Sequence, residues 1–172
     1  MTKLISPLLF LLIAMNSVSA KPWRGIVPLE STRTEVEKLL GKPADPEQPR
    51  YYFTNEIVTI EYSKYACGQA PLVKGWPTSL VIWNVKPDIV TVIRVDLRKA
   101  VLLSSLALNL SNFKRVPGYH LRNVFYYENR HEGFAIEVYE HAGIEMVRGY
   151  LYEPGAEYDH LRCPGVKRPS QR

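Results

Sequence analysis

The chain has 172 residues, of which 46% are hydrophobic and 23% charged, and its formal net charge is +5. This length and apolar content suffice for one ordinary domain, or for two small halves that share a core. The positive charges are dispersed along the chain, with a local concentration only in the tail at 164–172. Because nucleic-acid-binding proteins carry a basic patch or stripe, the composition argues against a nucleic-acid partner.

Residues 1–20 have the layout of a secretory signal peptide. Lys3 supplies the positive charge, the run from Leu4 to Met15 is almost entirely apolar, and Val18-Ser19-Ala20 is a small-residue cleavage site. The apolar run is shorter than the roughly 20 residues that span a bilayer, and no later stretch approaches that length. We therefore expect cleavage near Ala20 and a secreted or periplasmic protein with no membrane span; a retained N-terminal anchor is the alternative.

The sequence contains two cysteines, Cys67 and Cys163. In an oxidising compartment such a pair most simply forms one disulfide bond, which closes a loop of about 95 residues. The alternative is a reactive thiol at Cys67, which would leave Cys163 unpaired near the end of the chain. We expect the disulfide bond.

A short helix is predicted soon after the leader. Thr32 and Glu35 have the spacing of a capping box, in which each side chain accepts a hydrogen bond from the other residue's main-chain amide. An apolar stripe at helical spacing and a stop signal follow: Val36, Leu39, Leu40, Gly41 and Pro43. A helix this short needs a sheet to pack against.

Alternating patterns predict strands in two places. A hairpin is expected from Tyr51–Asn55 and Ile57–Ser63, with Val58, Ile60 and Tyr62 on one side. Three successive strands are expected later, at Val124–Asn129, Gly133–Tyr139 and Met146–Tyr152. Between the two groups, 89–97 is rich in β-branched residues and predicts a strand, and the apolar run at 98–108 predicts a second helix.

The two strand groups resemble each other. Tyr52-Phe53-Thr54-Asn55 is echoed by Tyr126-Tyr127-Glu128-Asn129, and Ile60-Glu61 by Ile136-Glu137. We therefore predict an α+β fold made of a tandem repeat, with half-repeats at 21–98 and 99–163 and a flexible basic tail at 164–172. The product is one antiparallel sheet of about six strands with two helices on one face. Chance similarity of two tyrosine-rich hairpins is the alternative.

The helix, the Leu40-Gly41-Lys42-Pro43 sequence and the aromatic strand at Tyr51-Tyr52 resemble the small secreted or envelope modules of the BamE (SmpA/OmlA) and beta-lactamase inhibitor protein type. The resemblance covers about forty residues well, and the rest of the chain by element order alone. It implies a module that binds other proteins and performs no chemistry. The lipid-bearing cysteine of BamE-like proteins and the several disulfides of the inhibitor family are absent from this sequence.

The best candidate site is the predicted sheet face away from the helices. Tyrosine and arginine are enriched at protein interfaces because they bury a large area and keep a polar end. The predicted partner-binding residues are Glu137, Tyr139, Arg148, Tyr150 and Tyr152. The alternative is that tyrosine simply suits a half-exposed strand.

Two other functions remain open. Glu61 and Glu137, equivalent in the repeat, can be the two carboxylates of a secreted hydrolase, or ordinary strand residues paired with Arg94 or Arg148. A pocket lined from Lys64 to Lys86 would instead indicate a small-ligand carrier. The sequence has no nucleophile elbow, phosphate loop, dinucleotide fingerprint or metal-ligand histidine spacing. We therefore expect no catalysis, no cofactor and no metal.

Overall fold

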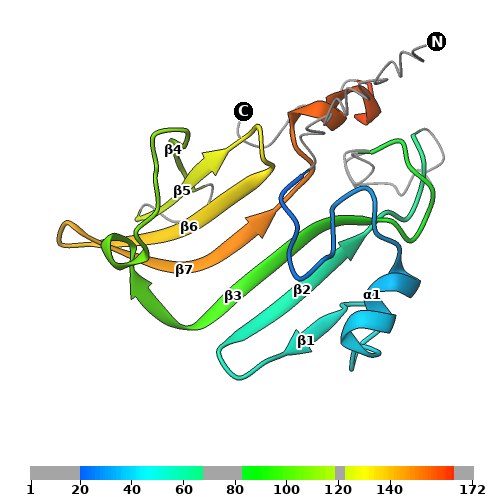
Figure 1. The fold of residues 1–172 in the computed structure, drawn as a ribbon, viewed down its shortest axis with the longest axis horizontal. Helices are drawn as coiled ribbons and strands as arrows, with labels where there is room; N and C mark the ends of the chain where they lie inside the picture. The colour runs from blue at the N-terminus through cyan, green and yellow to red at the C-terminus, as the bar shows by residue number, and fades with distance from the viewer. Residues whose placement is uncertain (1–19, 68–82, 119–122, 165–172) are drawn as a thin grey trace, which may run out of the picture.

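The computed structural model describes residues 20–67, 83–118 and 123–164 (Figure 1). These residues form one α-helix, two 3-10 helices and seven strands. The helices are α1 (Arg33–Leu40), η2 (Leu103–Leu106) and η3 (Ala156–Leu161). The strands are β1 (Arg50–Tyr52), β2 (Glu56–Tyr62), β3 (Val90–Leu102), β4 (Lys114–Pro117), β5 (Val124–Asn129), β6 (Phe134–His141) and β7 (Ile144–Tyr152). The expected leader, apart from Ala20, and the expected tail, apart from Pro164, lie outside the described residues.

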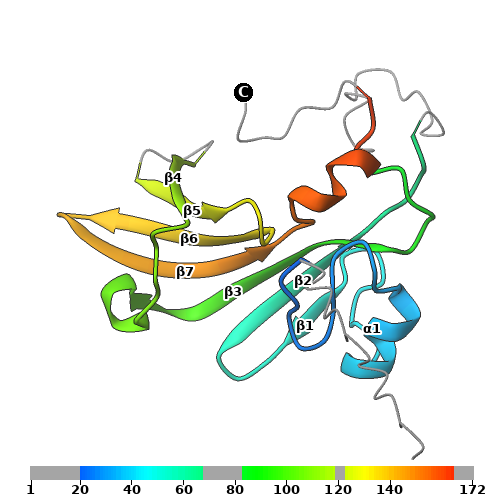
Figure 2. The same ribbon diagram turned by 45° about the horizontal axis from the view of Figure 1, so that its top comes forward.

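All seven strands lie in one antiparallel sheet with the order β1-β2-β3-β7-β6-β5-β4 (Figures 1 and 2). The predicted antiparallel α+β architecture is confirmed, but the expected six strands are seven. The additional strand, β4, pairs with β5 and lies between the expected second helix at 98–108 and the expected strand at Val124–Asn129. The expected boundary between 98 and 99 lies inside β3, so this strand runs from one expected half into the other.

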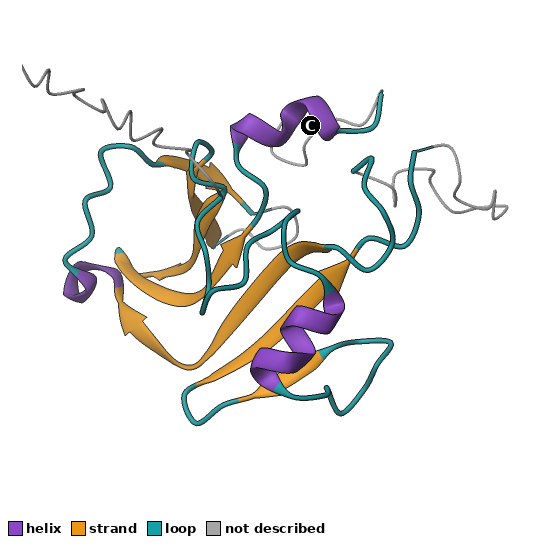
Figure 3. Ribbon diagram, turned by 45° about the vertical axis from the view of Figure 1, so that its right-hand side comes forward, coloured by secondary structure: helices purple, strands orange, loops and turns teal. Residues whose placement is uncertain are grey.

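The predicted first helix is confirmed together with its capping box. The main-chain amide of Thr32 donates to the Glu35 carboxylate at 2.8 Å, and the amide of Glu35 donates to the Thr32 hydroxyl at 3.3 Å. Gly41, with φ of +82°, ends the helix. Figure 3 shows α1 lying against one side of the sheet, where Val36 is buried while Leu39 remains 57% exposed.

The predicted second helix at 98–108 is wrong. β3 continues through this stretch to Leu102, and only Leu103–Leu106 forms a short 3-10 helix. After an irregular bend between Asp96 and Val101, Val101 pairs with Val147 and Leu102 pairs with Met146 of β7. A short apolar run has no periodicity that separates a helix from a strand, and here pairing with a strand distant in sequence decided the outcome.

Two hydrophobic clusters lie on the side of the sheet that α1 covers. The first joins α1 to β1, β2 and β3, and the second joins η2 to β6 and β7. Tyr150 and Tyr152 of β7 pack against both clusters, so they connect the two halves of the sheet. The N-terminal segment also contacts both halves, because Trp23 packs edge-on against Phe53 and the Lys21 ammonium lies 3.9 Å from the Phe134 ring centre.

A β-bulge in β7 changes which side chains face the clusters. Glu137 pairs with Gly149 and Val138 with Val147, which leaves Arg148 as the extra residue. A Cβ atom at Gly149 would lie 2.4 Å from the Val95 carbonyl oxygen, so only glycine allows β3 and β7 to approach this closely.

The predicted disulfide bond is confirmed. Cys67 and Cys163 are bonded, their Cα atoms are 5.5 Å apart, and the bridge spans 96 positions. Arg162, the residue before Cys163, forms an isolated β-bridge with Trp83. The bond therefore holds the segment after η3 against the segment that follows β2.

The search for membrane spans found no helix of sufficient length and apolarity among the described residues.

Removing the disulfide should destabilise the protein strongly. The double variant Cys67→Ser/Cys163→Ser loses a cross-link over a long loop, and we expect its free energy of unfolding to fall by about 2 to 5 kcal/mol. Urea denaturation in oxidising buffer measures the change. Wild-type protein with a reductant should match the variant; equal stability of oxidised wild type and variant would contradict the prediction.

The close contact at Gly149 gives a second stability prediction. In Gly149→Ala, the new Cβ meets main-chain atoms that move only if β3 and β7 separate, so we expect a loss of about 3 kcal/mol in the free energy of unfolding. Gly25→Ala is the control, because Gly25 has φ of +81° and open space around it. That variant should lose only about 1 to 2 kcal/mol through backbone strain. Equal losses in the two variants would show that β3 and β7 are not in close contact there.

Candidate functional site

The candidate site lies on the face of the sheet opposite α1 and the two clusters, which we call the open face. Strand alternation and the observed register assign residues of all seven strands to it. They are Arg50, Tyr52, Ile57, Thr59, Glu61, Val92, Arg94, Asp96, Met146, Gly149, Leu151, Ala135, Glu137, Tyr139, Val124, Tyr126, Glu128, Lys114 and Val116. The open face therefore combines charged groups with tyrosines.

A hydrogen-bonded group at the centre of the open face links three strands. The Arg94 guanidinium on β3 lies 3.3 Å from the Glu137 carboxylate on β6, and the Tyr126 hydroxyl on β5 donates to the same carboxylate oxygen at 3.1 Å. β7 lies between β3 and β6, where Leu151 pairs with Arg94 and Gly149 pairs with Glu137. Arg94 therefore reaches Glu137 diagonally across β7, past Gly149, which has no side chain. The Glu137 side chain is only 16% exposed, whereas that of Arg94 is 42% exposed.

The surroundings of this group raise the pKa of two open-face side chains. Burial, and then the negative charge of Glu137, raise the pKa of the Tyr126 phenol, which therefore remains a neutral donor. Burial likewise raises the pKa of Asp96, and the Glu137 charge adds to this effect, while Arg94 and Arg148 act in the opposite direction. We call Arg94, Asp96, Tyr126, Glu137 and Arg148 the open-face cluster.

The structure brings together only part of the predicted partner-binding set. Glu137 and Tyr139 lie on the open face, and the bulged residue Arg148 is exposed beside it. Tyr150 and Tyr152 pair with Ile136 and Phe134, so they lie on the clustered face, and their predicted place on the open face is wrong. The extra residue in β7 reverses the alternation on which that prediction was based.

Tyr150 and Tyr152 instead contribute to packing. Their ring centres lie 5.9 Å and 5.0 Å from that of Phe134. Burial raises the pKa of Tyr152 to about 12 and raises that of Tyr150 as well. These two tyrosines are therefore uncharged parts of the core.

The register separates the two carboxylates of the hydrolase hypothesis. Glu61 lies four positions along β2 from Ile57, and Ile57 is separated from Glu137 by β3 and β7. Strand geometry then places the Cα atoms of Glu61 and Glu137 roughly 20 Å apart. Glycosidase carboxylates lie within about 10 Å of each other. Glu137 is bonded to Arg94, as the alternative interpretation expected.

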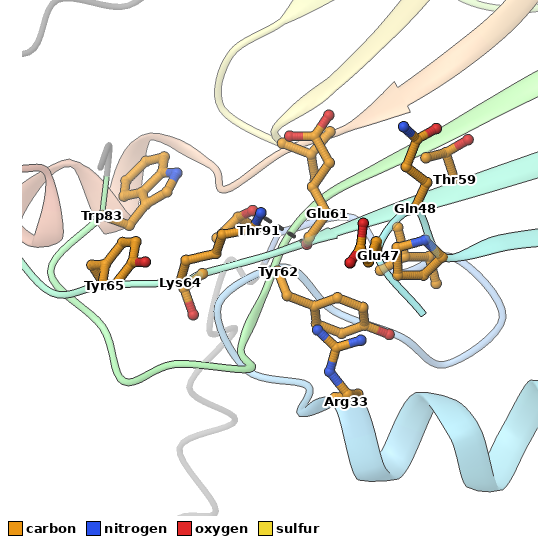
Figure 4. Close-up of a pocket in the computed structure, with 14 residues that line it drawn as sticks. Arg33, Glu47, Gln48, Thr59, Glu61, Tyr62, Lys64, Tyr65, Trp83 and Thr91 are labelled. Atoms are coloured by element: carbon orange, nitrogen blue, oxygen red, sulfur yellow. Dashed lines mark hydrogen bonds between the residues drawn. The ribbon is translucent and has the colours of Figure 1, made fainter. Parts of the chain in front are cut away.

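A pocket of about 450 Å³ lies at the end of β2 (Figure 4). Its volume is within the range of sites for small molecules or short peptides. Of the stretch from Lys64 to Lys86, where a small-ligand pocket was considered, Lys64, Tyr65 and Trp83 line part of it, and Ser63 adjoins them; the intervening 68–82 lie outside the described residues. The remaining lining residues come from α1, the segment before β1, β2 and β3: Arg33, Glu47, Gln48, Pro49, Thr59, Ile60, Glu61, Tyr62, Thr91 and Val92.

Within the described residues, no three His, Cys, Asp or Glu side chains come together in a group able to hold a metal ion. Comparison with models of protein families, with curated proteins and with solved structures found no match to this chain. The chemistry of the site therefore has to be argued from its own geometry.

Sequence reasoning missed Asp96 and Tyr126 as members of the site. The signal for Asp96 was available, because Arg94 and Asp96 alternate with apolar residues in a strand that otherwise reads as buried. Tyr126 had no such signal, since tyrosine suits either face of a strand.

The buried tyrosines predict a specific weakness at alkaline pH. A tyrosine with a higher pKa in the folded state stabilises the fold fully below its unfolded pKa of 10.0, and this contribution is lost as the pH rises towards about 12. Replacing Tyr152 by Phe should therefore flatten the decline of the unfolding free energy between pH 10 and pH 12. Tyr52→Phe, at a side chain 60% exposed, is the control and should leave the decline unchanged. A decline equally steep in all three proteins would be inconsistent with a buried Tyr152 phenol. Urea denaturation at several pH values measures these slopes.

Proposed function

We propose that this protein is an exported, non-catalytic binding module that captures a protein partner on the open face. The observation that carries the proposal is the bonding of Glu137 to both Arg94 and Tyr126 on that face. A carboxylate that accepts hydrogen bonds from two neighbouring side chains is fixed in position. It suits recognition better than catalysis.

The open-face cluster has the properties of a prepared binding surface. Three of its side chains, Arg94, Tyr126 and Glu137, are held by each other before a partner arrives, so association costs less conformational entropy. Arg148 and Asp96 are exposed beside the bonded group and supply opposite charges for pairing with a partner. Tyr126 and Tyr139 add the aromatic area that protein interfaces favour.

The proposed role agrees with the resemblance to BamE-like and beta-lactamase inhibitor protein-like modules, which also bind other proteins. Such a binding module can act as an inhibitor of a secreted enzyme or as an envelope scaffold. An extracellular or periplasmic location is part of the proposal: the sequence of 1–20 supports it, and the Cys67–Cys163 bond is compatible with an oxidising compartment.

We further propose that the fold arose by internal duplication. β1-β2-β3 and β5-β6-β7 are both antiparallel three-stranded units, and their last strands pair with each other. The equivalent residues Ile60 and Ile136 both face the clusters, while Glu61 and Glu137 both lie on the open face. A twofold rotation about the β3–β7 contact should then superpose the two units; failure to do so would indicate chance similarity.

The partner-binding proposal is tested by changing the exposed Arg148 and the half-buried Tyr139, which lie outside the two hydrophobic clusters. We expect Arg148→Glu combined with Tyr139→Ala to weaken partner affinity at least about tenfold, because it reverses one charge and removes one aromatic side chain. The matched control is Lys38→Glu combined with Leu39→Ala, at exposed positions of α1. Capture from the native extracellular fraction identifies the partner, and calorimetry with the purified partner gives the affinity. Equal affinities of wild type and the open-face variant would exclude this surface.

A further inference from the structure

β2 has a stretch of edge that no described strand covers. β1 pairs with β2 only at residues 57–59. One position further, the Ile60 amide donates to the Pro49 carbonyl at 3.0 Å. Pro49 has no amide hydrogen to return the bond, and the chain before it turns, as the amides of Glu47 and Gln48 donate to the Asp45 carboxylate. The ladder between β1 and β2 therefore ends at Pro49.

The main-chain groups beyond this point face outward. Along a strand, successive residues direct their amide and carbonyl groups to opposite neighbours. The amide of Ser63 donates to Ile89, and its carbonyl accepts from Asp88, so Ser63 bonds towards β3. The main-chain groups of Tyr62, the last residue of β2, consequently point away from β3, to a side where no described strand pairs with them. If the same alternation is continued past Ser63, the main-chain groups of Lys64 point to that side as well.

The pocket at the end of β2 runs along this edge. Seven consecutive residues line it, from Thr59 to Tyr65. Figure 4 shows Glu47 and Gln48 at one end, and Tyr65 and Trp83 at the other. The stretch between Ile60 and Lys64 is about 14 Å long, which is the length of a short extended peptide. The residues at both ends limit the space to a short segment, which disfavours a second copy of this sheet as the occupant.

We propose that this edge of β2 binds an extended peptide segment of another protein, which adds to the sheet as a further strand. The peptide main chain pairs with the outward groups of Tyr62 and Lys64, which is the basis of strand-addition binding. This site is separate from the open-face cluster and does not depend on the function proposed for it.

The side chains beside the edge define the peptide's chemistry. Glu61 and Tyr62 point to opposite sides of β2 (Figure 4). Glu61 has no ion-pair partner among the described residues, so its side of β2 favours a lysine or arginine of the peptide.

On the other side, the Arg33 guanidinium lies 4.0 Å from the Tyr62 ring centre and is bonded to Asp88 at 2.8 Å. This rigid surface suits an uncharged side chain. The expected ligand is thus an extended peptide with a basic residue on one side and uncharged residues on the other.

The first experiment separates strand pairing from side-chain binding. The probe is a fluorescein-labelled peptide about seven residues long, with lysine at its centre and valine and threonine alternating on either side. Two forms carry N-methyl groups, one on its even-numbered and the other on its odd-numbered amides. If the peptide pairs as a strand, one form loses binding and the other keeps it, because only alternate amides face β2. Fluorescence anisotropy measures all three affinities.

The second experiment changes the protein. Lys64→Pro removes an outward amide hydrogen, whereas Lys64→Ala removes the charge and keeps that hydrogen. We expect the proline variant to bind the lysine peptide at least about tenfold more weakly than the alanine variant does. Glu61→Gln should weaken the lysine peptide by about tenfold but leave a peptide with glutamine at its centre unaffected. Thermal melting shows whether each variant folds. If Lys64→Pro does not fold, the N-methylated peptides and Glu61→Gln still test the proposal.

Three outcomes would overturn the proposal. The first is no binding of the lysine peptide up to about 1 mM. The second is equal tolerance of both N-methylated forms, which would indicate a pocket that recognises side chains or small molecules only. The third is self-association of the protein that Lys64→Pro abolishes, which would show that a second copy occupies the edge.

Discussion

The pairing of β3 with β7 is the contact on which the rest of the structure depends. These strands are the third members of two three-stranded units, and their antiparallel contact turns the two units into one sheet. Tyr150 and Tyr152 of β7 pack against the hydrophobic clusters of both units, so burial reinforces the main-chain bonds. Without this contact, each unit would expose one edge strand and half of its apolar surface.

The same contact creates the open-face cluster. The bulge at Arg148 and the missing side chain at Gly149 allow β3 and β7 to approach each other closely. They also leave room for Arg94 and Glu137, on strands that are not neighbours, to meet over β7. Stability and the proposed binding surface therefore have one structural origin, and a substitution at Gly149 affects both.

The two proposed binding surfaces use different physical means. The open-face cluster presents charged and aromatic side chains, of which Arg94, Tyr126 and Glu137 are held by mutual hydrogen bonds. The edge of β2 presents main-chain groups left without a described strand partner where Pro49 ends the ladder. Proteins commonly protect exposed edges with proline, charge or short strands. Here the flanking residues Glu47, Glu61 and Trp83 border the edge, which restricts access to a short segment of suitable charge.

Local sequence determined the elements that depend only on residues close together in the chain. The capping box of Thr32 and Glu35, the stop at Gly41 and the hairpins of the second strand group follow from a few neighbouring residues. The pairing of Cys67 with Cys163 followed from there being two cysteines. The tertiary structure alone decided which face Tyr150 and Tyr152 occupy, because one bulged residue reverses the alternation of a strand. It also decided that the apolar stretch after Arg98 extends β3, since a strand is stabilised by a partner that its own sequence does not specify.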